Sequence, residues 1–164
     1  MSDQGVDEVK VVRPGEGECI WVTGNHYTFQ AVGQDTGGAY TLFEGVVPPG
    51  AGPPAHFHRR EVEAIYVLDG ELTFYVNGQT IPLGPGSFIH IPRLVVHSFK
   101  NLGTKTARML DMVSPAGMEE FLRETGHPVT DRSATPAPVT AADIAQVRSL
   151  APKYGIEIVS RPAE

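Results

Sequence analysis

Between residues 9 and 114 the hydrophobic residues come in short bursts of about 4 to 8, rich in Val, Ile, Phe and Tyr and separated by Gly, Pro, Asn or Asp. Bursts of this length, bounded by turn residues, predict β-strands. The expected strands span residues 9–13, 27–32, 40–47, 64–68, 71–76, 79–83, 87–91, 95–100 and 106–113. Their spacing, without helix-length patterns between them, favours an antiparallel sandwich or barrel over a βαβ sheet.

Two dipeptides within this region predict tight turns. Asp69-Gly70 and Asn77-Gly78 are residue pairs that accept the positive φ values of two-residue hairpin turns. We therefore expect a β-hairpin at each of them, with antiparallel pairing of the flanking strands.

The pattern changes after residue 114. Met118, Phe121 and Leu122 recur at helical spacing within residues 117–125, and Gly126 follows as a C-terminal stop. This spacing predicts a short amphipathic helix.

A connector and a second helix are expected next. Residues 128–139 are rich in Pro, Ser and Thr and predict an extended segment, after which Thr140 can cap a helix over 141–150. Residues 154–159 return to an apolar alternation, so we expect the tail to pack on the β-structure. We expect one domain over 1–164, with an extension and strand at 1–20, a barrel core at 21–114 and a tail at 115–164.

Composition narrows the class of protein. The chain has 164 residues and a mass of 17.7 kDa, the size of one globular domain, and 41% of its residues are hydrophobic, enough to form a core. Its formal net charge is −6 with only 13 Lys and Arg residues. Such a chain has no basic surface for a phosphate backbone or an anionic membrane, so we expect neither a nucleic-acid nor a membrane partner.

Cysteine content and the start of the chain bear on the compartment. Cys19 is the single cysteine, so no internal disulfide can form. The first residues carry neither the basic nor the apolar region of a secretion signal. We therefore expect a cytoplasmic protein.

The chemistry concentrates around a histidine pair. His56 and His58 are two positions apart, so on an extended chain both imidazoles point to one face. Glu63 lies five positions further on, and His97 lies in a later strand. Three neutral nitrogens and one carboxylate oxygen that converge inside a barrel form a divalent-metal site with open positions.

These residues resemble the two motifs of the cupin family. The first, G-x5-H-x-H-x4-E-x6-G, is matched without a departure by Gly50, His56, His58, Glu63 and Gly70. The second, G-x5-P-x-G-x2-H-x3-N, is matched by Gly86, Pro92, His97 and Asn101, with Leu94 in place of the family's Gly.

The resemblance implies an all-β fold, the double-stranded β-helix or jelly roll, followed here by short C-terminal helices. It also implies that His56, His58, Glu63 and His97 bind one divalent transition metal, which can be Ni, Co, Mn, Fe, Cu or Zn. Because Leu94 stands at a turn where Gly permits positive φ, we expect the loop before His97 to take another shape without loss of a ligand.

Several other residues have competing interpretations. Glu61 is a rival ligand to Glu63, but the family spacing selects Glu63, and we interpret Glu61 as part of a solvated loop with Arg59 and Arg60. His90 can line the pocket, although a surface or core position is favoured for it, as for His26 and His127. We expect Cys19 to be an inert core residue. The aromatic residues that we also assign to the core, rather than to a substrate platform, are Trp21, Tyr27, Phe29 and Phe43.

Runs at 114–121 and 153–157 resemble the tail of small bacterial cupins related to quercetin dioxygenases. The resemblance implies, as first hypothesis, a metal-dependent dioxygenase acting on an enolisable aromatic, flavonol or polyketide-like small molecule with dioxygen. Glu63 can serve as general base by loosening from the metal. A metal-dependent isomerase, cyclase or lyase is the second hypothesis, and a non-catalytic binding module the third. We expect a homodimer, with an N-terminal strand placed to cross to a neighbour.

Overall fold

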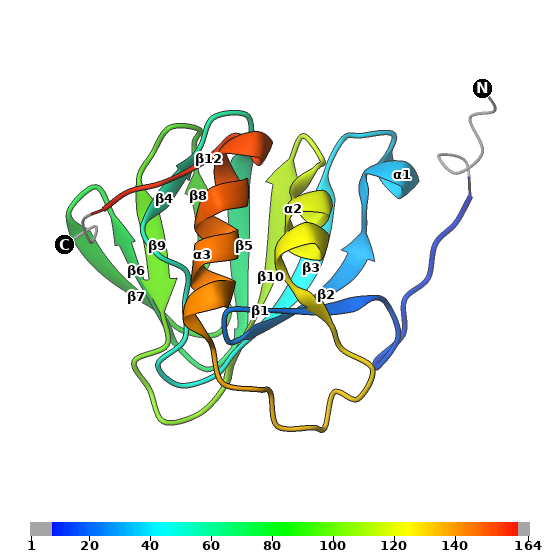
Figure 1. Ribbon diagram of the computed structural model, residues 1–164, viewed down its shortest axis with the longest axis horizontal. Coiled ribbons are helices and arrows are strands. Elements are labelled where there is room, and N and C mark those ends of the chain that lie inside the picture. The colour runs from blue at the N-terminus through cyan, green and yellow to red at the C-terminus, as the bar shows by residue number, and fades with distance from the viewer. Residues whose placement is uncertain (1–7, 161–164) are drawn as a thin grey trace.

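The structure is a computed structural model that describes residues 8–160, so the parts of the expected extension and tail at 1–7 and 161–164 lie outside the described residues. Its larger sheet contains β1 (Cys19–Val22), β2 (Asn25–Ala31), β3 (Thr41–Val47), β5 (Val62–Asp69), β8 (Phe88–Ile91), β10 (Ala107–Ser114) and β11 (His127–Pro128). Its smaller sheet contains β4 (His56–His58), β6 (Leu72–Val76), β7 (Gln79–Leu83), β9 (His97–Lys100) and β12 (Ile156–Ile158) (Figure 1).

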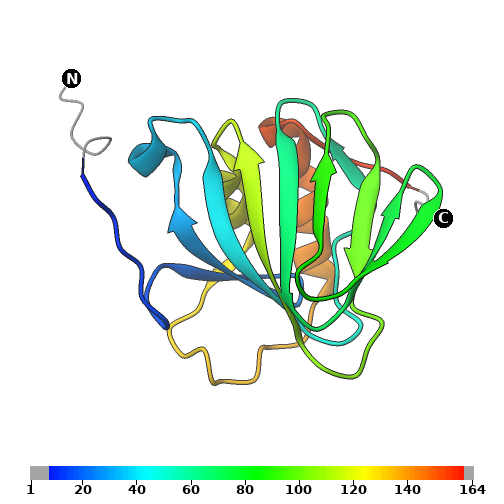
Figure 2. The same ribbon diagram turned by 180° about the vertical axis from the view of Figure 1, so that it is seen from behind.

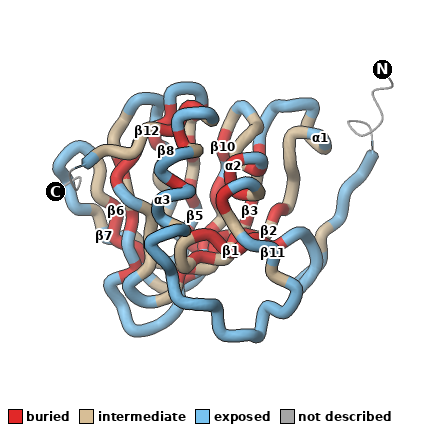
Figure 3. Tube along the Cα trace, viewed as in Figure 1, coloured by how far each residue is buried: buried red, intermediate tan, exposed pale blue. Residues whose placement is uncertain are grey.

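Both sheets are antiparallel, in the orders β11-β1-β2-β3-β10-β5-β8 and β12-β4-β9-β6-β7. Alternate residues of β3 and of β10 are buried, because one face of the sheet packs on the core (Figure 3). The core between the sheets includes Phe43, Ile65, Phe74 and Met109, each at most 1% exposed. This arrangement confirms the all-β jelly roll.

Helices cover part of the larger sheet. The helices are α1 (Gly33–Thr36), α2 (Met118–Thr125), α3 (Ala141–Leu150) and the 3₁₀ helix η1 (Ala151–Tyr154). Helices α2 and α3 lie side by side on the face of this sheet opposite to the one seen in Figure 2. No helix in the described part of the chain is long and apolar enough to cross a membrane.

The ends of both longer helices follow from their sequence. Thr140 Oγ1 accepts a hydrogen bond from the Asp143 backbone N–H, which confirms the expected cap of α3. Helix α2 ends before Gly126, as expected. A side chain at position 126 would place Cβ only 2.3 Å from Ile20 Cγ2, so glycine is required there by close packing against β1.

The tail returns to the barrel and packs on it, as expected. Strand β12 pairs with β4, and the register places Ile156 opposite His58 and Ile158 opposite His56. Residues more than 90 positions apart in sequence therefore share a ladder. The tail stabilises the short strand that carries the histidine pair.

One of the two expected hairpins is confirmed and the other is wrong. Asn77 and Gly78 have φ values of 49° and 76° and join β6 to its partner β7. Gly70 also has a positive φ, of 71°, but β5 pairs with β8 and β10 whereas β6 pairs with β7 and β9. The Asp69-Gly70 turn therefore carries the chain from one sheet to the other, since turn chemistry sets a reversal but not the pairing partner.

Residues 9–13 form no strand, contrary to expectation. Val9 and Val11 are 93% and 60% exposed, and the segment is held to α1 by an ion pair between Lys10 and Asp35. A strand needs a neighbour with an open edge, and both edges of the nearby β2 are taken, by β1 and β3. The short elements β1, β11 and α1 were not expected from the sequence.

Candidate metal centre

The four candidate ligands meet in the barrel interior. His56 and His58 lie on β4, Glu63 on β5 and His97 at the start of β9, where it pairs directly with His56. One nitrogen of each imidazole and one oxygen of the carboxylate all lie within 4.8 Å of one another. All four residues are buried, with 1% to 8% of their surface exposed.

Backbone carbonyls orient two of the imidazoles. Nδ1 of His56 lies 2.8 Å from the carbonyl oxygen of Pro54, and Nδ1 of His97 lies 2.9 Å from that of Val95. A carbonyl can only accept, so each Nδ1 carries the proton and donates it. Each Nε2 then faces the cluster, where a bound ion would take its lone pair, as in a metal-binding histidine.

The remaining contacts gather around the carboxylate. His97 Nε2 lies 2.6 Å from Glu63 Oε2, and His58 Nε2 lies 3.5 Å from the same oxygen. The rings of His56 and His97 have their centroids 4.3 Å apart. Three imidazoles and a single carboxylate thus share one small volume.

The surroundings of His58 show whether the four candidate ligands fit a metal ion. Both of its ring nitrogens are buried, and neither has a hydrogen-bond partner within residues 8–160. A buried polar atom left unpaired costs about 1–3 kcal/mol, so such an atom requires a partner. A divalent ion at Nε2 supplies one, and three neutral imidazoles with one carboxylate are a donor set that suits first-row transition metals. The residues therefore fit the ion that the motifs imply.

Glu61 is buried, not part of a solvated loop as expected. Only 6% of its surface is exposed, and its Oε2 lies 3.4 Å from His58 Nδ1, on the far side of the ring from Glu63. Arg59 and Arg60 are exposed, as expected. Glu61 lies outside the four-residue cluster and is placed to orient the imidazole of His58, as carboxylates behind metal-binding histidines do.

Asp111 is the residue that sequence reasoning missed. It lies on β10 opposite Ile65 of β5, is 3% exposed, and burial together with the charge of Glu63 raises the pKa of its carboxyl well above the ordinary value. Its Oδ1 has no hydrogen-bond partner in the described chain. The signal was present in the sequence, because the alternation along 107–113 places Asp111 on the same inward face as Met109 and Val113.

Tyr27 is a second buried titratable residue near Asp111. It is 8% exposed, and burial followed by the charge of Asp111 raises the pKa of its phenol. Asn25 Nδ2 donates a hydrogen bond of 3.2 Å to the phenol oxygen. Burial therefore favours the neutral form of both the phenol and the Asp111 carboxyl.

The pKa values of three candidate ligands are shifted from their ordinary values. Burial, followed by the neighbouring His97 and His58, lowers the pKa of His56 to about 3. Burial also opposes protonation of His58, but Glu61 and Glu63 outweigh it and raise its pKa to about 9. Burial works against the charged form of Glu63, but its two histidine neighbours outweigh burial and hold its pKa well below the ordinary value. Without metal, Glu63 is thus an anion whose counter-ion is His58.

The other sequence candidates lie elsewhere. His90 is exposed, and His26 and His127 are outside the cluster. The five residues assigned to the core are buried, as expected: Cys19, Trp21, Tyr27, Phe29 and Phe43.

The loop before His97 keeps a left-handed residue in spite of its sequence departure. Leu94 has a φ of 67°, so the expectation of a differently shaped loop is wrong. Its backbone N–H donates a hydrogen bond of 2.9 Å to the carbonyl oxygen of His58. This bond ties the loop to β4, which explains why the backbone tolerates a conformation that favours glycine.

Fold and cluster together define a cupin, and comparison with known proteins agrees. The Cupin domain family matches residues 43–113. The chain is 32% identical over 120 residues to the polyketide synthase CurC of Streptomyces cyaneus, covering 72% of this chain and 76% of that protein. The chain therefore belongs to the cupin superfamily.

Two further relatives extend the comparison. The chain is 30% identical over 118 residues to the quercetin 2,3-dioxygenase of Bacillus subtilis (strain 168), covering 72% of this chain but only 35% of that enzyme. It spans about a third of that relative's length. The crystal structure of a predicted oxalate decarboxylase from Thermotoga maritima shares the fold, with a TM-score of 0.60, 22% identity, and coverage of 65% of this chain and 99% of that one.

Proposed function

We propose that the protein is a metal-dependent dioxygenase that acts on an enolisable aromatic, flavonol or polyketide-like small molecule, with His56, His58, Glu63 and His97 as metal ligands. The observation that carries this proposal is the buried cluster, in which neither ring nitrogen of His58 makes a hydrogen bond within residues 8–160. Similarity to a quercetin dioxygenase and to a polyketide synthase protein supports the substrate class.

The donor set leaves an ion with a net charge near +1 and room for exogenous ligands. When bound, a divalent ion polarises an enol oxygen and, if redox-active, supports reaction of the enolate with dioxygen. Nickel, cobalt, manganese, iron and copper fit this chemistry, whereas zinc, which is not redox-active, fits a non-oxidative reaction better.

The chain's own residues handle the proton. Glu63 is anionic and lies at the centre of the cluster, so its carboxylate can accept the hydroxyl proton of an enol substrate. Burial and the charge of Glu63 raise the pKa of the Asp111 carboxyl, so this group is placed to return a proton to the product. The four residues of the cluster are 1% to 8% exposed, which limits the access of water to these transfers.

The test combines metal analysis with turnover. Protein purified without a histidine tag is analysed for metals and then assayed with flavonols and simple enols, with and without oxygen. We expect about one redox-active ion per chain, oxygen-dependent loss of substrate, and loss of both in Glu63→Ala and His97→Ala. His90→Ala is the matched control, because that histidine is exposed and outside the cluster. Full activity after metal removal would refute the proposal.

A second candidate function is a metal-dependent isomerase, cyclase or lyase. It is favoured by the Glu63 and Asp111 pair, in which the pKa of Glu63 is lowered and that of Asp111 is raised, because a proton donor and a proton acceptor side by side serve transfer at an enolisable carbon. Turnover under strict anaerobiosis, lost in Asp111→Asn with the metal retained, distinguishes it from the dioxygenase.

We also propose that the chain acts as a cytoplasmic homodimer. Val9 and Val11 are exposed on a segment that has no strand partner within residues 8–160, and a second copy can supply the missing edge. Light scattering on the full chain is expected to give twice the chain mass, and Val9→Lys with Val11→Lys is expected to give one chain mass.

A further inference from the structure

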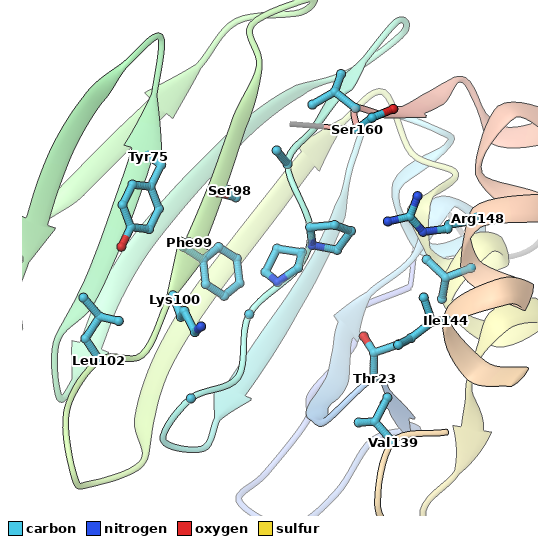
Figure 4. A pocket seen from close by; sticks show the side chains of 17 residues that line it. Thr23, Tyr75, Ser98, Phe99, Lys100, Leu102, Val139, Ile144, Arg148 and Ser160 are labelled. Atoms are coloured by element: carbon cyan, nitrogen blue, oxygen red, sulfur yellow. The ribbon is translucent and has the colours of Figure 1, made fainter. Parts of the chain in front are cut away.

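A groove lies outside the barrel, between the smaller sheet and α3. Its volume is about 670 Å³, within the range of small-molecule pockets, which is about 300–1,000 Å³. Its walls are the loop at 50–55, the face of β9 that carries Ser98 and Lys100, and the side of α3 that carries Arg148 (Figure 4). None of the four candidate metal ligands lines this groove, so it is distinct from the candidate metal centre.

The charge of the groove is opposite to that of the chain. The formal net charge of the chain is −6, yet the charged residues among the described lining are two basic ones, Lys100 and Arg148, with no acidic one. Figure 4 shows them reaching toward the space from opposite walls, β9 and α3. Neither forms an ion pair within residues 8–160. Two cations without a neutralising partner, facing one concave surface, create a positive local potential.

The rest of the wall is mainly apolar. Pro53 and Pro54 form one side, and Ile144 of α3, which is 46% exposed, forms the other. Tyr75 and Ser98 are direct cross-strand neighbours on β6 and β9 and add two hydroxyl groups. A rigid proline wall, an aromatic ring and an exposed aliphatic side chain suit an apolar ligand body better than a hydrated ion.

We propose that this groove binds a small amphipathic anion, that is, a molecule with an apolar ring or chain and one carboxylate, sulfonate or phosphate group. The anionic group lies between Lys100 and Arg148, and the apolar body lies against the prolines and Ile144. The proposal goes beyond the proposed function, because no ligand of the candidate metal centre takes part in it.

The groove is nonetheless connected to that centre through the backbone. Pro54 lines the groove, and its carbonyl oxygen accepts the hydrogen bond from His56 Nδ1. Binding is therefore measured together with the metal content of each variant, so that an effect on the groove is distinguished from an effect on the metal site.

The experiment uses two fluorescent probes of nearly the same shape. Anilinonaphthalene sulfonate carries one negative charge, and phenylnaphthylamine is its uncharged parent. Each is titrated into the full chain well below its unfolding temperature. We expect the sulfonate to bind one site per chain, about tenfold more tightly than the neutral probe, since two exposed cations each contribute about two- to fivefold.

Variants locate the site. Lys100→Ala with Arg148→Ala is expected to remove the preference for the anion and leave the neutral probe unchanged. Ile144→Glu is expected to weaken the sulfonate at least about tenfold, because it replaces apolar wall with a like charge. Ala145→Glu adds the same charge at an exposed position of α3 that does not line the groove, and is the matched control.

Three results would overturn the proposal. They are equal affinity for the two probes in the unmodified protein, an anion preference that survives in Lys100→Ala with Arg148→Ala, and equal effects of Ile144→Glu and Ala145→Glu. Metal content is expected to be the same in all these variants. An inactive or metal-free protein that still shows the pattern would refute the proposed function but not this site.

Discussion

Along the inward faces of β5 and β9 the side chains change from apolar at one end of the barrel to titratable at the other, and β10 adds one buried carboxyl beside them. On β5 the fully buried Val67 is followed inward by Ile65 and then Glu63, whereas on β10 Asp111 lies between two fully buried apolar residues, Met109 and Val113. Strand β9 changes in the same direction, from Phe99 to a histidine. The same strands therefore build an apolar end and a polar end.

The two ends contribute differently to stability. Burying Val67 or Met109 stabilises the fold by roughly 1.5–3 kcal/mol per side chain. Burying a polar atom without a hydrogen bond costs about 1–3 kcal/mol. Neither ring nitrogen of His58 makes a hydrogen bond in the described chain, although a carboxylate lies 3.4 or 3.5 Å from each. The apolar end therefore holds the barrel together, while the polar end contributes less to stability and gathers the candidate metal ligands.

The largest expected effect comes from the apolar end. Phe74→Ala removes a ring with 0% exposure, and we expect it to lower the free energy of unfolding by about 3–5 kcal/mol without changing metal content per folded chain. Urea denaturation measures the first and elemental analysis the second. Tyr66→Ala, which removes a 44% exposed ring of β5, is the control. A loss below about 1 kcal/mol would contradict the comparison.

Metal loading probes the polar end. A free ion at about 100 to 1,000 times its Kd is expected to raise the free energy of unfolding by roughly 2.7–4.1 kcal/mol, since it binds only the folded cluster. The increase should vanish in His97→Ala and persist in His90→Ala, which differ in burial but not in chemistry. Equal stabilisation of both variants would show that the ion binds elsewhere.

Glu61 tests how far the polar end extends beyond the four ligands. Glu61→Gln removes the charge behind His58 Nδ1, and we expect metal affinity to fall about 10- to 100-fold with the stoichiometry retained. Competition with a chromophoric chelator measures the affinity. The exposed Glu71→Gln serves for comparison, and should bind metal as the unmodified chain does.

The metal-free protein should be most stable near pH 6.5. The pKa of His56 is about 3 in the folded protein and 6.5 in the unfolded chain. Between these values the unfolded chain binds a proton and the folded protein does not, so the free energy of unfolding falls as pH decreases from 6.5 toward 3. The folded pKa of His58 is about 9, so its contribution is complete below 6.5 and is lost as pH rises through 9. We expect the free energy of unfolding to be roughly 1–2 kcal/mol lower near pH 5 and near pH 8.5 than near pH 6.5. Urea denaturation in the presence of a chelator at these three pH values measures the difference. A monotonic change would contradict these shifts.

The smallest effect concerns the loop behind β4. Leu94 combines a φ of 67° with 62% exposure, so Leu94→Gly relieves backbone strain at little loss of contact, and we expect a gain of about 0.5 kcal/mol. Leu102 is also 62% exposed but has no positive φ, so Leu102→Gly is expected to give no gain. Thermal unfolding of both variants distinguishes strain relief from a general effect of removing an exposed leucine.

The order of strands along the chain and the candidate ligands followed from the sequence. Strand patterns have a period of two and helix patterns one of 3.6, which is local information, so the helix 141–150 with its Thr140 cap could be predicted. The spacing of His56 and His58 determines that both face one side of a strand, whatever surrounds them. Both motifs therefore indicated the cluster before any fold was known.

Tertiary structure alone decided which segments pair. Asp69-Gly70 and Asn77-Gly78 have the same local turn chemistry, yet only the second joins paired strands, because pairing depends on which edges are open in the assembled sheets. Residues 9–13 stay unpaired for the same reason. Burial of Glu61 and the contact of Asp111 with Glu63 likewise depend on segments distant in sequence. The sequence thus determined which residues are candidate ligands and which way the histidine pair faces. The buried environment that sets their protonation forms only when the two sheets pack together.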